Sequence, residues 1–328
     1  MNPLRKLLHY HDQLRLERSD ALRIPDRDWR ELVRSHNIPS QHTQVCDSGK
    51  LRLDKVGIEL SKAELPTVVL QGYRNLLELL AKTGGSVSVI GDGDVVFTVD
   101  GIHHILENIE QYMILNEIYA EGSYDINTDA PLFIVDAGAN AGFASLYFAN
   151  KLNDVRVHAF EPVRHTFQKA KRNLALNPEL SDRINLNNYG LGKDDGKQMI
   201  YFDQDRPGNA TLVRDNPFTV GVREEIPIEI KRVSPLIDEL HESDPSRRIL
   251  LKLDCEGSEY DILSDLEDSG SLQWISGMMG EWHQVDDQLS RGWIEDLLLR
   301  NGFLVNIEKR YLPDALTGVF RAFRLNEK

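Results

Sequence analysis

The chain has 328 residues, and its 52 acidic against 38 basic side chains leave a formal net charge of −14. An acidic chain repels polyphosphate and carries no basic stripe with interleaved aromatic residues, so nucleic acid is not an expected partner. No run approaches the roughly 18 consecutive apolar residues of a membrane span, and the charged N-terminus is unlike a secretory signal. Only two cysteines occur, which argues against a disulfide framework and favours a cytoplasmic location.

The first 130 residues show helical and hairpin patterns. Residues 1–85 are expected to be mainly helical, and one apolar helical face comprises Tyr73, Leu76, Leu77 and Leu80. Two strand-like runs, 86–90 and 95–99, flank Gly91-Asp92-Gly93-Asp94, which predicts a β-hairpin. A later helical face comprises Ile102, Ile105, Leu106, Ile109 and Met113. We interpret residues 1–130 as a cap or oligomerisation region, which would also supply the contact of a homodimer.

From residue 131 to residue 328, short apolar runs alternate with helical patterns. This alternation predicts an α/β domain in which helices cover both faces of a mostly parallel sheet. The expected strands are residues 132–136, 155–160, 184–190, 249–254, 277–283, 303–309 and 319–325, of which the last is antiparallel. Helices are expected near residues 164–177 and 288–300.

The stretch VDAGANAGFASL (135–146) places Asp136 at the end of a buried strand and a turn of small residues after it. Without bulky side chains, the backbone of such a turn can lie against a ligand. The next helix points its positive end at an anionic group of that ligand. Asn140 stands where the dinucleotide fingerprint has its second glycine, so an amino-acid carboxylate fits better here than a pyrophosphate. A plain tight turn is the structural alternative.

The stretch HAFEP (158–162) puts Glu161 at the end of the next strand, 25 residues after Asp136. An acidic residue at this place in a βαβ unit can accept hydrogen bonds from both ribose hydroxyls of a nucleoside. The combination with the glycine-rich turn predicts a nucleoside-binding site. It does not name the cofactor, because a nicotinamide cofactor can use the same acid.

These motifs, in this order, resemble those of the FkbM-type methyltransferases. The resemblance covers about residues 132–265, through VDAGANAGFASLYFA, FEPVRHTFQKAKRNLALN, NYGLGKDDGK and LLKLDCEGSEYDIL. Residues 105–126 are similar to the approach segment of that family, whereas residues 1–85 match no part of it. The resemblance implies a Rossmann-like seven-stranded sheet, S-adenosylmethionine as the cofactor, and O-methylation of a small or sugar-like acceptor.

The resemblance also implies which residues bind the cofactor. Those around its methionine end are Asp136, Gly138, Asn140 and Gly142. Glu161 holds the ribose, and Phe143 and Pro162 are further cofactor-binding residues. Those that border the adenine are Tyr189 and Gly190.

Two further strand ends carry polar side chains. Period-two alternation puts Lys252, Asp254 and Glu256 on one side of a strand, and Glu281 and His283 on one side of the next. Lys252 needs a partner inside an apolar strand, and Asp254 is the natural one. A structural ion pair is therefore the alternative to a functional role for this motif.

Asp254, Glu281 and His283 are the candidate catalytic residues. His283 would act as a general base oriented by a carboxylate, or the three would bind a divalent cation that lowers the pKa of an acceptor hydroxyl. A purely structural His283 is the third possibility. In GNATLV (208–213), Asn209 and Thr211 could bind the acceptor, although a plain turn explains the segment nearly as well.

The sequence thus predicts an S-adenosylmethionine-dependent O-methyltransferase that acts on a small-molecule, sugar-like or natural-product hydroxyl. A divalent cation remains an option for the acceptor side. The alternatives are an N-methyltransferase of the same fold, a nicotinamide-dependent oxidoreductase, and a non-catalytic nucleoside-binding module.

Overall fold

The computed structural model describes residues 24–62, 65–91, 93–202, 224–309 and 316–324. Contacts divide the chain into two compact units, Met1–Gly122 and Ser123–Lys328. None of the helices in the described ranges is both long and apolar enough to cross a membrane.

The described part of the first unit begins with a helix and a small antiparallel sheet. These elements are α2 (Arg27–Ser35), the 3₁₀ turn η2 (Ser40–His42), β1 (Thr43–Val45), β2 (Leu51–Leu53) and β3 (Ile58–Leu60). The prediction that residues 1–85 are mainly helical is therefore wrong for residues 43–60. Each of these strands has only three residues, which is too short for a strand period to stand out in the sequence.

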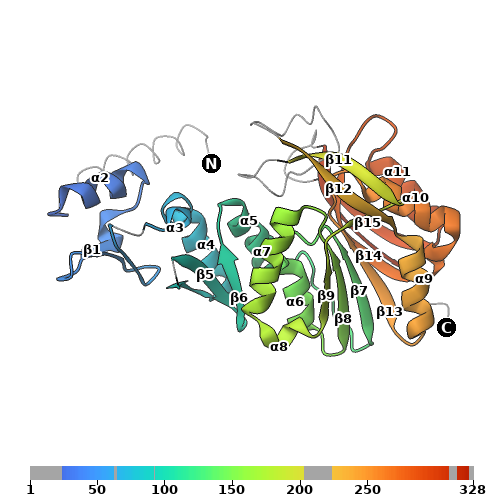
Figure 1. The fold of residues 1–328 in the computed structure, drawn as a ribbon, viewed down its shortest axis with the longest axis horizontal. Coiled ribbons are helices and arrows are strands. Elements are labelled where there is room, and N and C mark those ends of the chain that lie inside the picture. The colour runs from blue at the N-terminus through green and yellow to red at the C-terminus, as the bar shows by residue number, and fades with distance from the viewer. Residues whose placement is uncertain (1–23, 63–64, 92, 203–223, 310–315, 325–328) are drawn as a thin grey trace, which may run out of the picture. The chain divides into compact units, whose positions relative to one another are not determined.

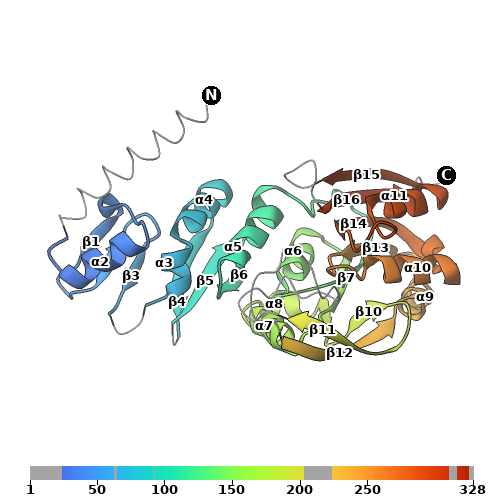
Figure 2. The ribbon, with the colours of Figure 1, turned by 90° about the horizontal axis from the view of Figure 1, so that it is seen from above.

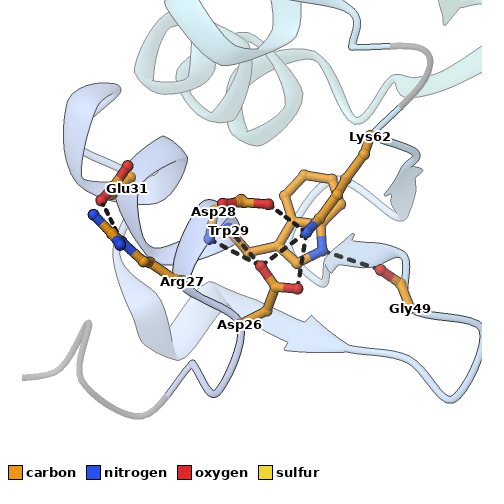
Figure 3. A network of polar contacts seen from close by, with 7 residues as sticks. All are labelled: Asp26, Arg27, Asp28, Trp29, Glu31, Gly49 and Lys62. Atoms are coloured by element: carbon orange, nitrogen blue, oxygen red, sulfur yellow. Dashed lines mark hydrogen bonds and ion pairs between the residues drawn. The ribbon is translucent and has the colours of Figure 1, made fainter.

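Polar contacts tie helix α2 to the turn between β1 and β2 and to Lys62 after β3 (Figure 3). Asp26 caps the helix, since its carboxylate accepts the backbone N–H groups of Asp28 and Trp29 at 2.9 and 3.1 Å. Lys62, which follows β3, pairs with the carboxylates of Asp26 and Asp28 at 2.9 and 2.8 Å. The buried Trp29 donates its indole N–H to the carbonyl of Gly49 at 3.0 Å. The ion pairs are exposed, so the buried indole is the stronger anchor.

The rest of the first unit combines helices with a second antiparallel sheet. In chain order it comprises α3 (Thr67–Gln71), α4 (Tyr73–Thr83), β4 (Ser86–Ile90), β5 (Asp94–Val99), β6 (Ile102–Leu106), α5 (Glu110–Leu115) and the π-helical turn η3 (Asn116–Ala120). The antiparallel pairing of β4 with β5 confirms the predicted hairpin.

The helix predicted from Ile102 onward is wrong at its start, because residues 102–106 form strand β6. Asp100 and Gly101 both have positive φ, 51° and 82°, as the central residues of a type I′ hairpin turn require. This turn folds β6 back onto β5 as an antiparallel partner. Helix begins only at Glu110.

The second unit contains the predicted seven-stranded sheet. Its strands in chain order are β7 (Leu132–Ala137), β8 (Val155–Phe160), β9 (Ile184–Asn187), β13 (Arg248–Leu253), β14 (Ile275–His283), β15 (Phe303–Lys309) and β16 (Thr317–Arg324). Their spatial order is β15-β16-β14-β13-β7-β8-β9. Neighbours from β14 to β9 pair in parallel, and β16 runs antiparallel to both β14 and β15. The prediction of a Rossmann-like, mostly parallel sheet is confirmed.

Helices cover both sides of this sheet. They are α6 (Phe143–Lys151), α7 (Arg164–Ala175), α8 (Pro178–Ser181), α9 (Ser234–Ser243), α10 (Glu259–Ser269) and α11 (Arg291–Arg300). Figures 1 and 2 show α6 and α7 on one side and α9, α10 and α11 on the other. Buried side chains such as Leu251, Ile262 and Leu297 form the core between the sheet and the second group of helices.

A small three-stranded sheet was not predicted. The strand expected at residues 184–190 is interrupted: β9 ends at Asn187, and β10 (Gly190–Gly192) pairs instead with β12 (Glu224–Arg232). An antiparallel strand, β11 (Gly196–Phe202), completes the sheet. Figure 2 shows these strands as a layer of their own beside the large sheet. Parallel strands end at one edge of the large sheet, and this edge carries the polar residues considered next.

Candidate active site

A buried ion pair joins the ends of the two central strands, β7 and β13. Asp136 and Lys252 are register partners, and the Lys252 ammonium lies 3.0 Å from the Asp136 carboxylate but 3.7 Å from that of Asp254. Asp136 is thus the closer partner of Lys252, rather than the expected Asp254. Lys252 also donates to the carbonyl of Gly138 at 2.7 Å, and Ser145 donates its hydroxyl to Asp136 at 2.6 Å.

Lys252 stays charged in this setting. Burial alone would lower the pKa of its ammonium, but the carboxylate of Asp136, followed by Tyr124 and Asp254, raises it well above the usual value. The ammonium also lies 5.9 Å from the centre of the Tyr124 ring. Tyr124, which the sequence did not single out, therefore lies beside the strand ends.

The glycine-rich turn after β7 has an unusual backbone. Gly138, Asn140 and Gly142 have φ values of 85°, 48° and 80°, a region that disfavours side chains with a Cβ. At Gly138 a Cβ would lie only 1.8 Å from the backbone oxygen of Asp254. The first glycine is therefore needed for close packing against the end of β13, whereas the sequence suggested room for a ligand. Phe143 begins α6 and its side chain is buried, so only its backbone could face a ligand.

Glu161 connects this turn to the end of β8. Its carboxylate accepts the backbone N–H groups of Asn140 and Val163, both at 2.9 Å. Burial raises the pKa of Glu161 to about 7, against the opposing effect of these two hydrogen bonds. The two bonds use two of the roughly four acceptor positions of a carboxylate. Two acceptor positions of the carboxylate therefore remain.

The residues expected near an adenine lie beside β10. The half-buried ring of Tyr189 packs against Phe160, with ring centres 5.3 Å apart, and the Lys231 ammonium lies 4.1 Å from its centre. At Gly190 a Cβ would lie 2.7 Å from Ile230 and 3.5 Å from Pro162. Gly190 is therefore explained by packing between β10, β12 and the residue that follows Glu161.

A second cluster lies at the ends of β13 and β14. Single ligand atoms of Asp254, Glu256 and His283 lie within 4.8 Å of one another. The Nε2 atom of His283 is 3.7 Å from the Glu256 carboxylate and 3.8 Å from that of Glu281. The structure therefore brings the three predicted catalytic residues together and adds Glu256.

Glu259 is a site residue that the sequence analysis missed. It is fully buried at the start of α10, and the His283 Nδ1–H donates to its carboxylate at 3.0 Å. The backbone N–H groups of Cys255 and Gly257 donate to the same carboxylate at 2.9 and 2.8 Å. The spacing Glu-Gly-Ser-Glu (256–259) was the available signal, because a carboxylate in the first turn can accept backbone N–H groups there.

The crowding of carboxylates controls the charges in this cluster. Burial would lower the pKa of His283, but Glu256, Glu259 and Asp254 raise it well above the usual range. Burial raises the pKa of Glu256 to about 8, although His283 opposes the shift. For Glu259, the neighbouring imidazolium and the hydrogen bonds outweigh burial, so its pKa is lowered. The predicted acceptor-binding residues Asn209 and Thr211 lie outside the described residues.

The fold and the edge of the sheet define an α/β protein in which a glycine-rich turn is bonded to a buried Glu161, with a polar cluster at the ends of β13 and β14. The FkbM domain of methyltransferases matches residues 136–305 of the chain. The chain belongs to this family and is a methyltransferase, which confirms the resemblance seen in the sequence.

Individual relatives agree with this assignment. The chain is 29% identical to methyltransferase sdnD of Sordaria araneosa over 244 residues, which cover 65% of this chain and 90% of the relative. It is 30% identical to methyltransferase 1 of Beauveria bassiana over 227 residues, which cover 61% and 84%. A crystal structure of an FkbM methyltransferase from Methylobacillus flagellatus is 16% identical with a TM-score of 0.41. That match covers 79% of this chain and only 60% of the solved chain, and the family assignment does not depend on it.

Proposed function

We propose that the protein transfers a methyl group from S-adenosylmethionine to a hydroxyl of a small-molecule, sugar-like or natural-product acceptor. The observation that carries the proposal is the buried Glu161 carboxylate, which is hydrogen-bonded to the glycine-rich turn and keeps acceptor positions for a ribose. Membership of a methyltransferase family supports S-adenosylmethionine as the bound nucleoside. Family membership also favours a methyltransferase over a nicotinamide-dependent oxidoreductase.

Each group of cofactor-binding residues would contact a different part of S-adenosylmethionine. The turn at Gly138, Asn140 and Gly142 would lie along the methionine end, where Asp136 and Lys252 form a fixed pair. Glu161 and Pro162 would face the ribose. Tyr189 and Gly190 would border the adenine, and the backbone of Phe143 would face the methionine carboxylate at the start of α6. S-adenosylmethionine supplies an activated methyl group on a sulfonium.

Asp254, Glu281 and His283 would act on the acceptor. An in-line methyl transfer needs a positioned hydroxyl and removal of its proton. The pKa of His283 is raised by its carboxylate neighbours, so the ring holds a proton at neutral pH and must lose it before it can serve as a base. A bound cation that acidifies the hydroxyl is the other route.

Further features of the proposal concern the rest of the chain. Residues 1–130 would form a cap over the acceptor or a homodimer contact. Cys46 and Cys255 are both free thiols, which supports a cytoplasmic location.

The test compares two cofactors on the full-length protein. Isothermal titration with S-adenosylmethionine should give saturable binding with one site, and titration with NADH should give none. Binding of NADH without S-adenosylmethionine would overturn the proposal. Methylation of an amine in place of a hydroxyl would keep the fold and cofactor but replace the acceptor class, and product mass spectra with fragment assignment distinguish the two.

A further inference from the structure

The acceptor-side cluster has the composition of a metal site. Asp254 and Glu256 come from the turn after β13, and His283 comes from the end of β14, so two neighbouring strands supply the three ligand atoms within 4.8 Å. Two carboxylates and one imidazole form a donor set typical of divalent first-row transition metals. Glu281 lies at the edge of this set, 3.8 Å from Nε2 of His283.

The imidazole is oriented from outside the cluster. Glu259 is fully buried, and its carboxylate holds Nδ1 of His283 at 3.0 Å. Because Nδ1–H is the donor of this bond, Nε2 is the nitrogen that faces Glu256 and Glu281. A carboxylate that accepts the second ring N–H is what fixes the tautomer and direction of metal-binding histidines. The same Glu259 also accepts N–H groups from Cys255 and Gly257, so it holds the turn that carries Asp254 and Glu256.

Carboxylates crowd around the His283 imidazole. Those of Glu256 and Glu281 lie 3.7 and 3.8 Å from its Nε2 atom, and a carboxylate oxygen of Asp254, 3.7 Å from the Lys252 ammonium, completes the group. A dication would offset the repulsion between these carboxylates in partly buried surroundings, where such repulsion is strongest.

We propose that Asp254, Glu256 and His283 bind one divalent cation of the manganese or zinc type, and that Glu259 acts as the positioning residue for His283. This inference rests on the proposed function, because the cation would take the acceptor oxygen as a further ligand and lower its pKa. A bound cation, rather than a general base, would then activate the acceptor hydroxyl. Glu256, rather than Glu281, is the third protein ligand beside Asp254 and His283. An imidazole ligand favours manganese or zinc over magnesium.

The test measures the cation directly. Full-length protein is treated with a chelator, dialysed, and titrated with Mn²⁺, whose free fraction is followed by electron paramagnetic resonance. We expect one saturable site. Glu256→Gln and His283→Gln should each weaken Mn²⁺ binding by at least about tenfold, and Glu259→Gln by about 10- to 100-fold, as for a lost outer partner of a ligand. Asp268→Asn is the matched control, since Asp268 lies at the far end of α10, the helix that begins with Glu259. This variant should bind Mn²⁺ like the wild type.

The same samples are titrated with S-adenosylmethionine, which separates this inference from the proposed function. Cofactor binding without a saturable Mn²⁺ site overturns the cation site and leaves the methyltransferase proposal standing. If the wild-type protein does not bind S-adenosylmethionine, the proposed function itself is overturned. If Glu256→Gln does not fold, Asp254→Asn and His283→Gln carry the test. Wild-type affinity for Mn²⁺ in both would refute the ligand assignment.

Discussion

Replacement of Glu161 is the sharpest probe of the cofactor site. In the proposed complex its carboxylate accepts both ribose hydroxyls, and each hydrogen bond to a charged group contributes about 1.5–3 kcal/mol. Loss of one such bond already corresponds to roughly tenfold or more in affinity. Calorimetric titration of Glu161→Ala with S-adenosylmethionine should therefore show at least tenfold weaker binding, while Glu179→Ala, at an exposed position, should bind like the wild type.

The raised pKa gives this prediction a second, independent readout. Burial brings the pKa of Glu161 to about 7, and the ionised carboxylate is the stronger acceptor for ribose hydroxyls. The ionised fraction falls from about nine tenths at pH 8 to about one tenth at pH 6, so affinity should fall about tenfold between them. Glu161→Gln cannot ionise and should show no such slope. An affinity of Glu161→Ala equal to that of the wild type, or the same pH slope in Glu161→Gln, would refute the ribose assignment.

The stability of the folded protein depends on the same ionisation, with a defined sign. The pKa of Glu161 is about 7 in the folded chain and 4.5 ordinarily, so the folded state binds more protons between these values. The free energy of unfolding should therefore fall as pH rises from about 4.5 to about 7, by at most about 3 kcal/mol from this group. Urea unfolding of the wild type and of Glu161→Gln at about pH 4.5 and pH 7 isolates the effect. If the free energy of unfolding of the wild type rose with pH relative to that of the variant, the result would contradict this prediction.

Three further predictions concern the sheet edge and the first unit. Lys252→Met leaves the fully buried Asp136 without its ion-pair partner and should lower the free energy of unfolding by about 3–5 kcal/mol in urea titration; a loss below 1 kcal/mol would contradict the pairing. Gly138→Ala should lower the melting temperature strongly, because the new Cβ would lie 1.8 Å from a backbone oxygen. The control is Gly196→Ala, whose Cβ would have no neighbour within 4 Å and should leave the melting temperature nearly unchanged. Equal melting temperatures of the two variants would rule out the packing argument. Residues 1–85, expressed alone, should not unfold cooperatively if they act as a cap or dimer contact, so a dispersed NMR spectrum of this fragment would show that reading to be wrong.

The sequence predicted the second unit well because its signals are local. Strands β7, β8 and β13 are each followed closely by a helix, and Asp136 and Glu161 each stand at the end of a strand-like run. Parallel strands with helical crossovers bring such strand ends to one edge, so position in sequence translates into position in space.

The missed features depend on contacts that one stretch of sequence does not contain. Ile102 and Ile105 fit a helical period equally well, and only the positive φ of Asp100 and Gly101 selects the hairpin. An Asp-Gly pair was the available signal for that turn. Lys252 was assigned to Asp254, two residues away, although strand register places Asp136 opposite it.

Glu259 shows the same limit at the acceptor side. Its role arises from a hydrogen bond to His283, 24 positions away in the chain, and from complete burial. From the sequence alone, it is an acid in the first turn of a helix, where many acids occur for their favourable interaction with the helix dipole. The fold is what turns this residue into a support for the site.

Transfer of a labelled methyl group tests the central claim most directly. Full-length protein is incubated with methyl-labelled S-adenosylmethionine and the small-molecule fraction of a cell extract, and products are separated and identified by mass spectrometry. The account predicts a labelled small molecule with a new O-methyl group and an equal amount of S-adenosylhomocysteine, both reduced by at least about 10²-fold with His283→Ala. S-adenosylhomocysteine formation no higher than with boiled protein, or full turnover by His283→Ala, would contradict it.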